Sequence, residues 1–208
     1  MSPDPDPLSY PLTRDAIFGI AHDLGAPFRL VAELTRLVEI EHSDLPADTL
    51  ETLALIRQQG EKGGLMMQGL LSLEAAESVE VNFRTVELGE LEALSGPGSP
   101  TVPVETDPKI LDLALGELID NAKRYGKFAK PLIRWSDQEV TIVITDGGPG
   151  ISEDRWLDAL RPFVRLSGAL TAQALGLGLT RAVALSRRAG GHLGNHSDGV
   201  GITLKKAR

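Results

Sequence analysis

Residues 144–152 read ITDGGPGIS and join a strand pattern to a glycine-rich turn. From Glu139 to Asp146 the chain is nearly all β-branched, which predicts a β-strand that ends in a carboxylate. The glycines that follow, Gly148 and Gly150 among them, let a ligand approach the backbone closely. A carboxylate placed there can accept a hydrogen bond from an exocyclic amine such as that of adenine. An ordinary tight turn capped by aspartate fits the same letters, so this stretch alone leaves both interpretations open.

Upstream, residues 108–126, PKILDLALGELIDNAKRYG, have apolar residues at helical spacing and end at a glycine. Glu117 and Asn121 are four apart and therefore share one face of the expected helix. Both offer oxygen to a hard cation such as Mg²⁺, and Lys123 and Arg124 can neutralise phosphate. A solvated polar face opposite the apolar one is the alternative interpretation.

Downstream, Gly176 and Gly178 precede a helix expected over about residues 177–189. Free N–H groups at the start of such a helix can hold a phosphate. The dinucleotide fingerprint GxGxxG is not met, and a flexible helix entry explains the two glycines equally well.

The remaining pattern from residue 79 onward mixes helices and strands without β-α-β alternation, which predicts a two-layer α/β sandwich over residues 79–208. Residues 85–94 are expected to form a short helix, and about 25 residues before Gly176 are expected to be irregular. Strands are expected at residues 79–83, 100–106, 132–136, 139–146 and 201–206.

Residues 12–78 show two long helical patterns, 12–41 and 49–76, joined by HSDLPAD with Asp48 as the expected N-cap. Two such helices form an antiparallel hairpin, and a hairpin of this size has too little core by itself. Pairing with a second copy into a four-helix bundle is the expected completion. Glycines inside the second helix each cost about 0.8–1 kcal/mol relative to alanine, and the sequence does not explain them. They are Gly60, Gly63, Gly64 and Gly69.

Composition restricts the function classes. The net charge of −8 argues against nucleic acid as the main partner, and 4% aromatic residues argue against base-stacking platforms. The chain has no cysteine, which excludes disulfides and thiolate metal sites. It has no apolar run of membrane-spanning length and no signal-peptide pattern, and the proline-rich residues 1–11 are expected to be a disordered leader. A cytoplasmic protein is therefore expected.

Five motifs occur in one order, and together they resemble those of bacterial two-component sensor histidine kinases. HDLGAP (22–27) is similar to the phosphoacceptor histidine box, and DNAKRY (120–125) to the asparagine box. DGGPGI (146–151) and GLGL (176–179) are similar to the two glycine boxes, and RPF (161–163) to the phenylalanine box. The resemblance covers residues 12–208.

This resemblance implies a dimerisation and histidine-phosphotransfer hairpin over residues 12–78, followed by an ATP-binding domain of the gyrase–chaperone–kinase type. Asn121 would hold Mg²⁺ against the triphosphate of ATP, with Glu117 nearby. Asp146 would read the adenine amine. Gly176 and Gly178 would bound a mobile lid over the phosphates, and Phe163 would dock that lid toward the helical domain. The other implied nucleotide-binding residues are Lys123, Arg124, Tyr125, Gly148, Gly150, Gly176, Leu177 and Gly178.

The resemblance also implies a reaction. His22 would attack the γ-phosphorus of ATP while Asp23 orients or accepts the imidazole proton, and the phosphoryl group would pass to an aspartate of a response-regulator receiver domain. Ala26 stands where many relatives carry Thr or Asn, which predicts weak phosphatase activity. Glu117 in place of Asn and Ala174 in place of Gly are further departures that bear on magnesium and nucleotide handling.

Other interpretations stay open. The chain could be a histidine phosphotransferase with an ATP-inactive second domain that relays phosphate between receivers. It could also be a Ser/Thr kinase or ATPase of the same superfamily without His22 chemistry. No sensor segment is recognisable, which fits a stand-alone kinase core or an excised fragment. The remaining histidines, His42, His192 and His196, are expected to be surface or structural residues.

Overall fold

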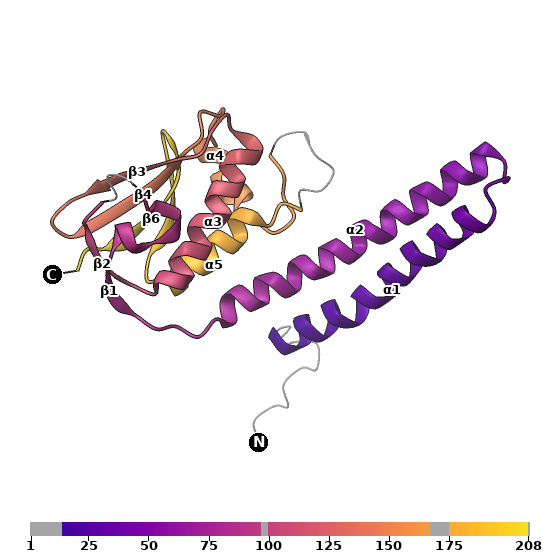
Figure 1. Cartoon of the computed structure of the whole chain (residues 1–208), viewed down its shortest axis with the longest axis horizontal. Helices are drawn as coiled ribbons and strands as arrows, with labels where there is room; N and C mark the ends of the chain where they lie inside the picture. Colours follow the sequence, from indigo (N-terminus) through magenta and orange to yellow (C-terminus); the bar gives the residue numbers. More distant parts are fainter. Residues whose placement is uncertain (1–13, 97–99, 167–174, 208) are drawn as a thin grey trace, which may run out of the picture. The chain divides into compact units, whose positions relative to one another are not determined.

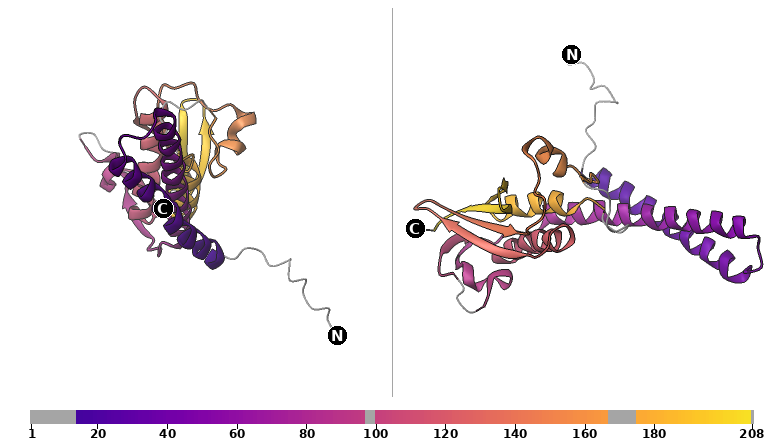
Figure 2. Two further views of the ribbon diagram at one scale, coloured as in Figure 1. Left: turned by 90° about the vertical axis from the view of Figure 1, so that its right-hand side faces the viewer. Right: turned by 90° about the horizontal axis from the view of Figure 1, so that it is seen from above.

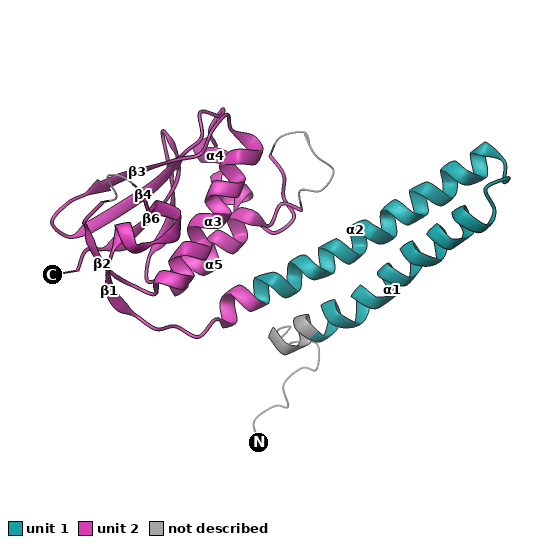
Figure 3. Cartoon of the chain, viewed as in Figure 1, with its two compact units in different colours: residues 1–74 teal, residues 75–208 magenta. Residues whose placement is uncertain are grey.

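The computed structural model describes residues 14–96, 100–166 and 175–207, with the side chains described from residue 19 onward. The chain divides after Glu74 into two compact units, which Figure 3 distinguishes by colour. The expected leader, residues 1–11, lies outside the described residues.

The first unit is a helical hairpin. Helix α1 spans Arg14–Glu41 and helix α2 spans Ala47–Ser78, so α2 begins earlier and ends later than the sequence pattern predicted. The expectation that Asp48 is the N-cap is wrong, because Asp48 already lies in the first helical turn. The helix begins directly after Pro46, whose carbonyl oxygen accepts hydrogen bonds from the N–H groups of Thr49 and Leu50.

Two glycines of α2 allow the helices of the hairpin to approach closely. Gly60 and Gly63 are buried, and α2 continues through both without a break. A Cβ on Gly63 would lie 2.4–2.6 Å from ring atoms of Phe28. A Cβ on Gly60 would lie 3.0 Å from the carbonyl oxygen of Phe28 and from the backbone nitrogen of Ala32. The low helix propensity of these glycines is therefore offset by the close packing of α1 against α2, which a larger residue would force apart.

The second unit contains two antiparallel sheets. The small sheet pairs β1 (Arg84–Glu87) with β2 (Pro103–Thr106). The four-stranded sheet has the order β3-β4-β6-β5. Its strands are β3 (Lys130–Trp135), β4 (Glu139–Thr145), β5 (His192–His196) and β6 (Gly199–Lys205). The helices are α3 (Pro108–Tyr125), α4 (Glu153–Ala159) and α5 (Gly178–Arg188).

Helices α3 and α5 lie side by side and form one layer against the four-stranded sheet (Figures 1 and 2). The apolar face of α3, with Ile110, Leu111 and Leu115 fully buried, packs into one cluster with alternate residues of the central strands. Those strand residues are Val140, Ile142, Ile144, Ile202 and Leu204. This two-layer arrangement after a helical hairpin confirms the predicted fold class.

Residues 79–83 were predicted to be a strand, and that prediction is wrong. Their backbone polar groups bond to side chains instead of to a neighbouring strand: the N–H of Asn82 donates to Asp107 Oδ2 at 2.7 Å. The carbonyl oxygen of Val79 accepts a hydrogen bond from the Arg188 guanidinium. Val79 and Val81 still pack against the core, so their apolar pattern reports burial and not strand pairing.

Two more local expectations differ from the structure. Residues 85–94 form no α-helix; they contain most of β1 and the 3₁₀ turns Leu88–Glu90 and Glu92–Leu94. A reciprocal capping box between Glu87 and Glu90 holds the first of these turns. The stretch expected to be irregular contains the short helix α4.

Within the described ranges, no helix combines the length and apolarity that crossing a membrane requires.

Candidate functional site

The loop after β4 presents the Asp146 carboxylate at the end of the four-stranded sheet. Asp146 Oδ1 accepts a hydrogen bond from the N–H of Gly148 at 2.7 Å, and this bond holds the turn. A carboxylate has lone pairs on two oxygens, so this contact does not exhaust its capacity to accept. Gly147 has φ +61°, and a Cβ there would lie 2.6 Å from the ring of Phe128. Glycine is therefore required at residue 147 both for the turn and for the ring that packs on it.

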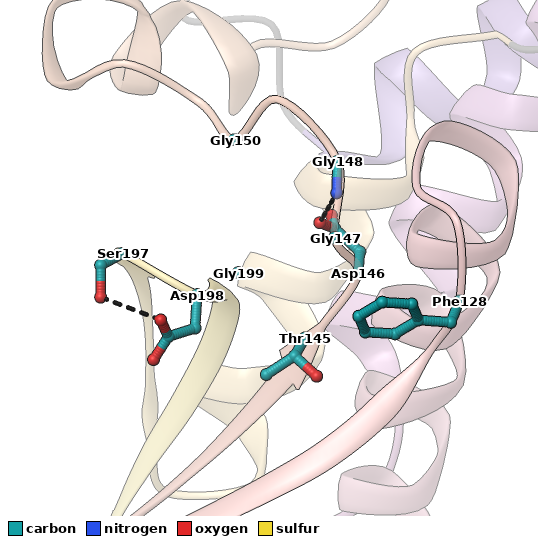
Figure 4. A pocket seen from close by; sticks show the side chains of 9 residues that line it. All are labelled: Phe128, Thr145, Asp146, Gly147, Gly148, Gly150, Ser197, Asp198 and Gly199. Carbon is teal, nitrogen blue, oxygen red and sulfur yellow. Dashed lines mark hydrogen bonds between the residues drawn. The ribbon is translucent and has the colours of Figure 1, made fainter.

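A pocket of about 400 Å³ opens beside this loop. It brings together three predicted residues, Asp146, Gly148 and Gly150, and Figure 4 shows the β5–β6 turn on the opposite side of the opening. The pocket also has lining residues that sequence reasoning missed: Phe128, Thr145, Gly147, Ser197, Asp198 and Gly199. Ser197 and Asp198 carry an ordinary turn signature, and only the pairing of β4 with β6 places them here. The other predicted nucleotide-binding residues do not line this pocket.

The C-terminal end of α3 adjoins the Asp146 loop. The N–H groups of Lys127 and Phe128 both donate to the carbonyl oxygen of Asp146, at 2.7 and 3.2 Å. A Cβ on Gly126 would lie only 2.5 Å from that same oxygen. The last turn of α3 is therefore held against the loop, and with it the predicted phosphate contacts Lys123 and Arg124, which are exposed.

The middle of α3 carries the predicted magnesium residues. Glu117, Asn121 and Tyr125 are half-buried and follow one another along α3 at intervals of about one helical turn. No group of three or more His, Cys, Asp or Glu side chains that could hold a metal ion occurs in the parts of the chain that are described. The amide oxygen of Asn121 suits a Mg²⁺ ion that keeps waters and is bound chiefly by substrate phosphates, and Glu117 stands one helical turn before it. This arrangement therefore fits a nucleotide-borne Mg²⁺.

Helix α5 begins at Gly178, and the preceding Leu177 is buried. The N-cap residue Leu177 makes no side-chain hydrogen bond to the first N–H groups of the helix, because leucine has no polar side-chain atom. The N–H of Phe163 donates to the carbonyl oxygen of Gly176 at 3.0 Å, and both residues have positive φ, +64° and +70°. The structure thus brings Phe163 and Gly176 together, whereas Ala174 lies outside the described residues.

An ion pair crosses from α3 to α5. Arg181 Nη2 lies 3.0 Å from Glu117 Oε1, and the side chains are 35% and 19% exposed. Burial raises the pKa of Glu117, and the positive charge of Arg181 opposes that rise. Sequence reasoning missed Arg181, because only the packing of α5 on α3 brings it to Glu117.

The predicted phosphoacceptor lies in the first unit. His22 is on α1 with a side chain that is 71% exposed, and its Nδ1 lies 3.2 Å from Asp23 Oδ1. Pro27 lies inside α1, which continues past it to Glu41. The imidazole is therefore accessible and already has an adjacent carboxylate.

Comparison with known proteins identifies the second unit. Residues 106–205 match the family of histidine kinase-, DNA gyrase B- and HSP90-like ATPases. Sensor histidine kinase GtrS of Pseudomonas aeruginosa is 31% identical over 200 residues, which is 91% of this chain and 38% of GtrS. Sensor histidine kinase CpxA of Escherichia coli is 25% identical over 179 residues, 79% of this chain and 39% of CpxA. The chain thus spans well under half the length of these curated relatives.

Solved structures agree in fold. The histidine kinase AdeS of Acinetobacter baumannii matches with a TM-score of 0.53 at 21% identity, covering 86% of this chain and 94% of that one. Full-length ShkA, solved in complex with AMPPNP, matches with a TM-score of 0.54 at 20% identity, covering 93% of this chain and 45% of that one. The motifs, the fold and these relatives confirm the resemblance: the chain belongs to the bacterial two-component sensor histidine kinases.

Proposed function

We propose that this chain is an ATP-dependent histidine autokinase that phosphorylates His22. The observation that carries the proposal is the convergence in one unit of three segments far apart in sequence. These are the Asp146 loop, the end of α3 that bonds to it, and the start of α5, which is tied to α3 by an ion pair. The accessible His22 beside Asp23 supplies an acceptor in the same chain.

Each nucleotide group has a proposed contact. Asp146 accepts from the adenine amine, with Gly148 and Gly150 leaving space for the base. Lys123 and Arg124 neutralise phosphate, Tyr125 packs near the nucleotide, and the N–H groups that follow Gly176, Leu177 and Gly178 receive phosphate oxygens. Asn121 contributes its amide oxygen to Mg²⁺, with Glu117 one turn away. When bound, Mg²⁺ neutralises charge on the phosphates.

His22 acts as the nucleophile in an in-line phosphoryl transfer. A proton on Nδ1 that is held by Asp23 leaves the nucleophilic lone pair on Nε2. The bond from Nε2 to the γ-phosphorus forms as the bond from that phosphorus to the bridging oxygen of ADP breaks. Asp23 then accepts or stabilises the Nδ1 proton of the charged ring. The predicted role of Phe163 in docking a lid stays a proposal: the N–H of Phe163 donates to the carbonyl oxygen of Gly176, and residues 167–174 lie outside the described residues.

We propose that the hairpin pairs with a second copy. Large apolar side chains remain at least 36% exposed along both helices, and few of the hairpin's described side chains are buried. A second hairpin that covered them would complete a four-helix bundle. They are Ile20, Leu24, Phe28, Leu30, Val31, Leu34, Leu37, Val38, Ile40, Leu55, Ile56 and Leu65.

The phosphoryl group is proposed to pass from His22 to an aspartate of a response-regulator receiver domain. Ala26 has no polar group that could position water one turn after His22, so phosphatase activity toward that receiver is proposed to be weak. A receiver phosphorylated chemically and then mixed with this chain tests this point, because rapid loss of its phosphate would contradict it. A cytoplasmic location stays a prediction, which fractionation of cells that express the chain tests.

The second candidate is a phosphotransferase whose ATP domain is inactive and which relays phosphate between receivers. The specific feature in its favour is Ala174, which departs from the glycine that leads the second glycine box in the resemblance.

One labelling experiment separates these functions. The purified full chain is incubated with Mg²⁺ and γ-labelled ATP, and the stability of the label to acid and base is measured. Acid-labile, base-stable label is expected, lost in His22→Ala and retained in the matched control His42→Ala, since His42 is equally an exposed histidine of the hairpin. No label and no nucleotide binding would favour the relay. Acid-stable label would indicate a Ser or Thr acceptor.

A further inference from the structure

The ion pair between Glu117 and Arg181 joins the two helices that carry the proposed magnesium and phosphate contacts. Glu117 stands one turn before Asn121 on α3, and Arg181 lies in the first turn of α5. The charged atoms are 3.0 Å apart, and both side chains are at least partly buried. The pair is therefore screened less by solvent than a fully exposed surface ion pair.

The Glu117 carboxylate faces the start of α5. Its Oε2 lies 3.8 Å from the position that a Cβ on Gly178, the first residue of that helix, would take. The start of a helix attracts negative charge, so a carboxylate here occupies the same favourable field that a phosphate would use. A second negative charge at this place opposes the approach of a triphosphate.

Arg181 removes this conflict. With the guanidinium on Oε1, the pair has no net charge, and the carboxylate is held toward α3 and α5. The pKa of Glu117 is raised by burial, and Arg181 is the main opposing influence on it. Without Arg181, a half-buried carboxylate without its main counter-charge would stand beside the nucleotide phosphates.

We propose that Arg181 is a positioning residue for nucleotide binding, which acts by neutralising and holding the Glu117 carboxylate at the start of α5. This inference rests on the proposed function and adds a residue to it. Two other roles for Arg181 are distinguishable from this one. The Arg181 side chain is 35% exposed, so its guanidinium could instead bind a phosphate directly. The pair could also serve only to hold the helices together.

The test is a double-mutant cycle on the full chain with Arg181→Gln, Glu117→Gln and the double variant. Binding of ATP with Mg²⁺ and binding of adenosine are measured by calorimetry, and folding is checked by thermal unfolding. Arg84→Gln is the matched control, because Arg84 also pairs with a glutamate of this unit, Glu90, away from the proposed contacts.

We expect Arg181→Gln to weaken ATP binding by about tenfold and to leave adenosine binding within about twofold of the wild type. The double variant is expected to recover ATP binding to within about twofold of the wild type, because the repelling charge is gone. Glu117→Gln alone is expected to bind ATP at least as tightly as the wild type. Higher salt should reduce the defect of Arg181→Gln.

Four results overturn the inference. Two of them concern Arg181→Gln: unchanged ATP binding, or an equal loss of ATP and adenosine binding. A third is weak ATP binding that persists in the double variant, which would indicate direct contact between Arg181 and phosphate. The fourth is weak Mg²⁺-dependent ATP binding in Glu117→Gln, which would make Glu117 a metal ligand. If Arg181→Gln does not fold, the comparison of Glu117→Gln with the double variant still decides, because equal affinities support the inference and a loss refutes it. If the wild-type chain binds neither ATP nor adenosine, the proposed function is refuted as well.

Discussion

Asp107 is the residue whose replacement tests most directly how the second unit holds α3 in place. Its side chain is 5% exposed. Oδ1 accepts from the N–H groups of Lys109 and Ile110 at 3.0 and 3.2 Å, and Oδ2 accepts from the N–H of Asn82 at 2.7 Å. One carboxylate therefore caps α3 and also binds the segment that follows α2.

The magnitude follows from these contacts. Loss of an N-cap costs about 1 kcal/mol, and a partly buried N–H left without an acceptor costs about 1–3 kcal/mol. Asp107→Ala is therefore expected to lower the free energy of unfolding by about 2–4 kcal/mol. At about 4 °C per kcal/mol for a unit of this size, the Tm falls by roughly 8–16 °C. Asp107→Asn is expected to lose less than Asp107→Ala, because its one carbonyl oxygen can still accept from one side of the contact.

Tryptophan fluorescence during urea unfolding is the assay. The chain has 2 tryptophans, Trp135 and Trp156, and both lie in the second unit, so the signal reports on that unit. Asp120→Ala, an exposed aspartate of the same helix, is the control and is expected to stay within about 0.5 kcal/mol of the wild type. If Asp107→Ala also stays within about 0.5 kcal/mol, the assignment of three supported N–H groups to this carboxylate is refuted.

Three further outcomes are expected. Gly63→Ala should destabilise the hairpin by about 1–2 kcal/mol, because its Cβ would overlap the ring of Phe28 on α1. Gly64→Ala should stabilise the hairpin by up to about 1 kcal/mol, because its Cβ would lie 3.6 Å from its nearest neighbour and alanine has the higher helix propensity. Circular dichroism at increasing urea measures both, and equal effects would contradict the packing argument. Gly147→Ala should weaken ATP binding by about tenfold, because the positive φ of residue 147 and its contact with Phe128 both oppose a Cβ there. Calorimetry measures the affinity for ATP, and a wild-type affinity would contradict this prediction. Burial lowers the pKa of His196 below 6.5, so the folded chain binds that proton less readily than the unfolded chain, and stability should fall as pH drops below 6.5. His196→Gln should flatten this part of the stability–pH curve, and an unchanged slope would exclude the histidine as its cause.

Local patterns predicted the long elements well and the short ones poorly. The helix of residues 108–125 has an apolar stripe, a proline in its first turn and a glycine after its end, and the structure has α3 there. Residues 79–83 carry an equally apolar pattern, but their hydrogen-bond partners are Asp107 and Arg188, which lie far along the chain. A short segment is decided by where its backbone groups find partners, and periodicity carries no information about that.

The candidate site divides in the same way. Asp146 and Asn121 were predicted from their motifs, and the structure places Asp146 at a pocket and Asn121 on the helix that adjoins it. Phe128 was missed because nothing in its neighbours marks a ring that will pack on Gly147. Arg181 was missed for a related reason, since its partner Glu117 is on another helix.

The sequence by itself determined the two-unit organisation into a helical hairpin and an α/β sandwich, the order of the motifs and the family. These depend on periodicity and on chemistry carried within short segments, which are present before the chain folds. Only the tertiary structure decided why α2 contains glycines, where the segment after α2 bonds, and that Glu117 meets Arg181 at the start of α5. Those features depend on the distance between residues remote in sequence, and that distance is set by how helices and strands pack into one core.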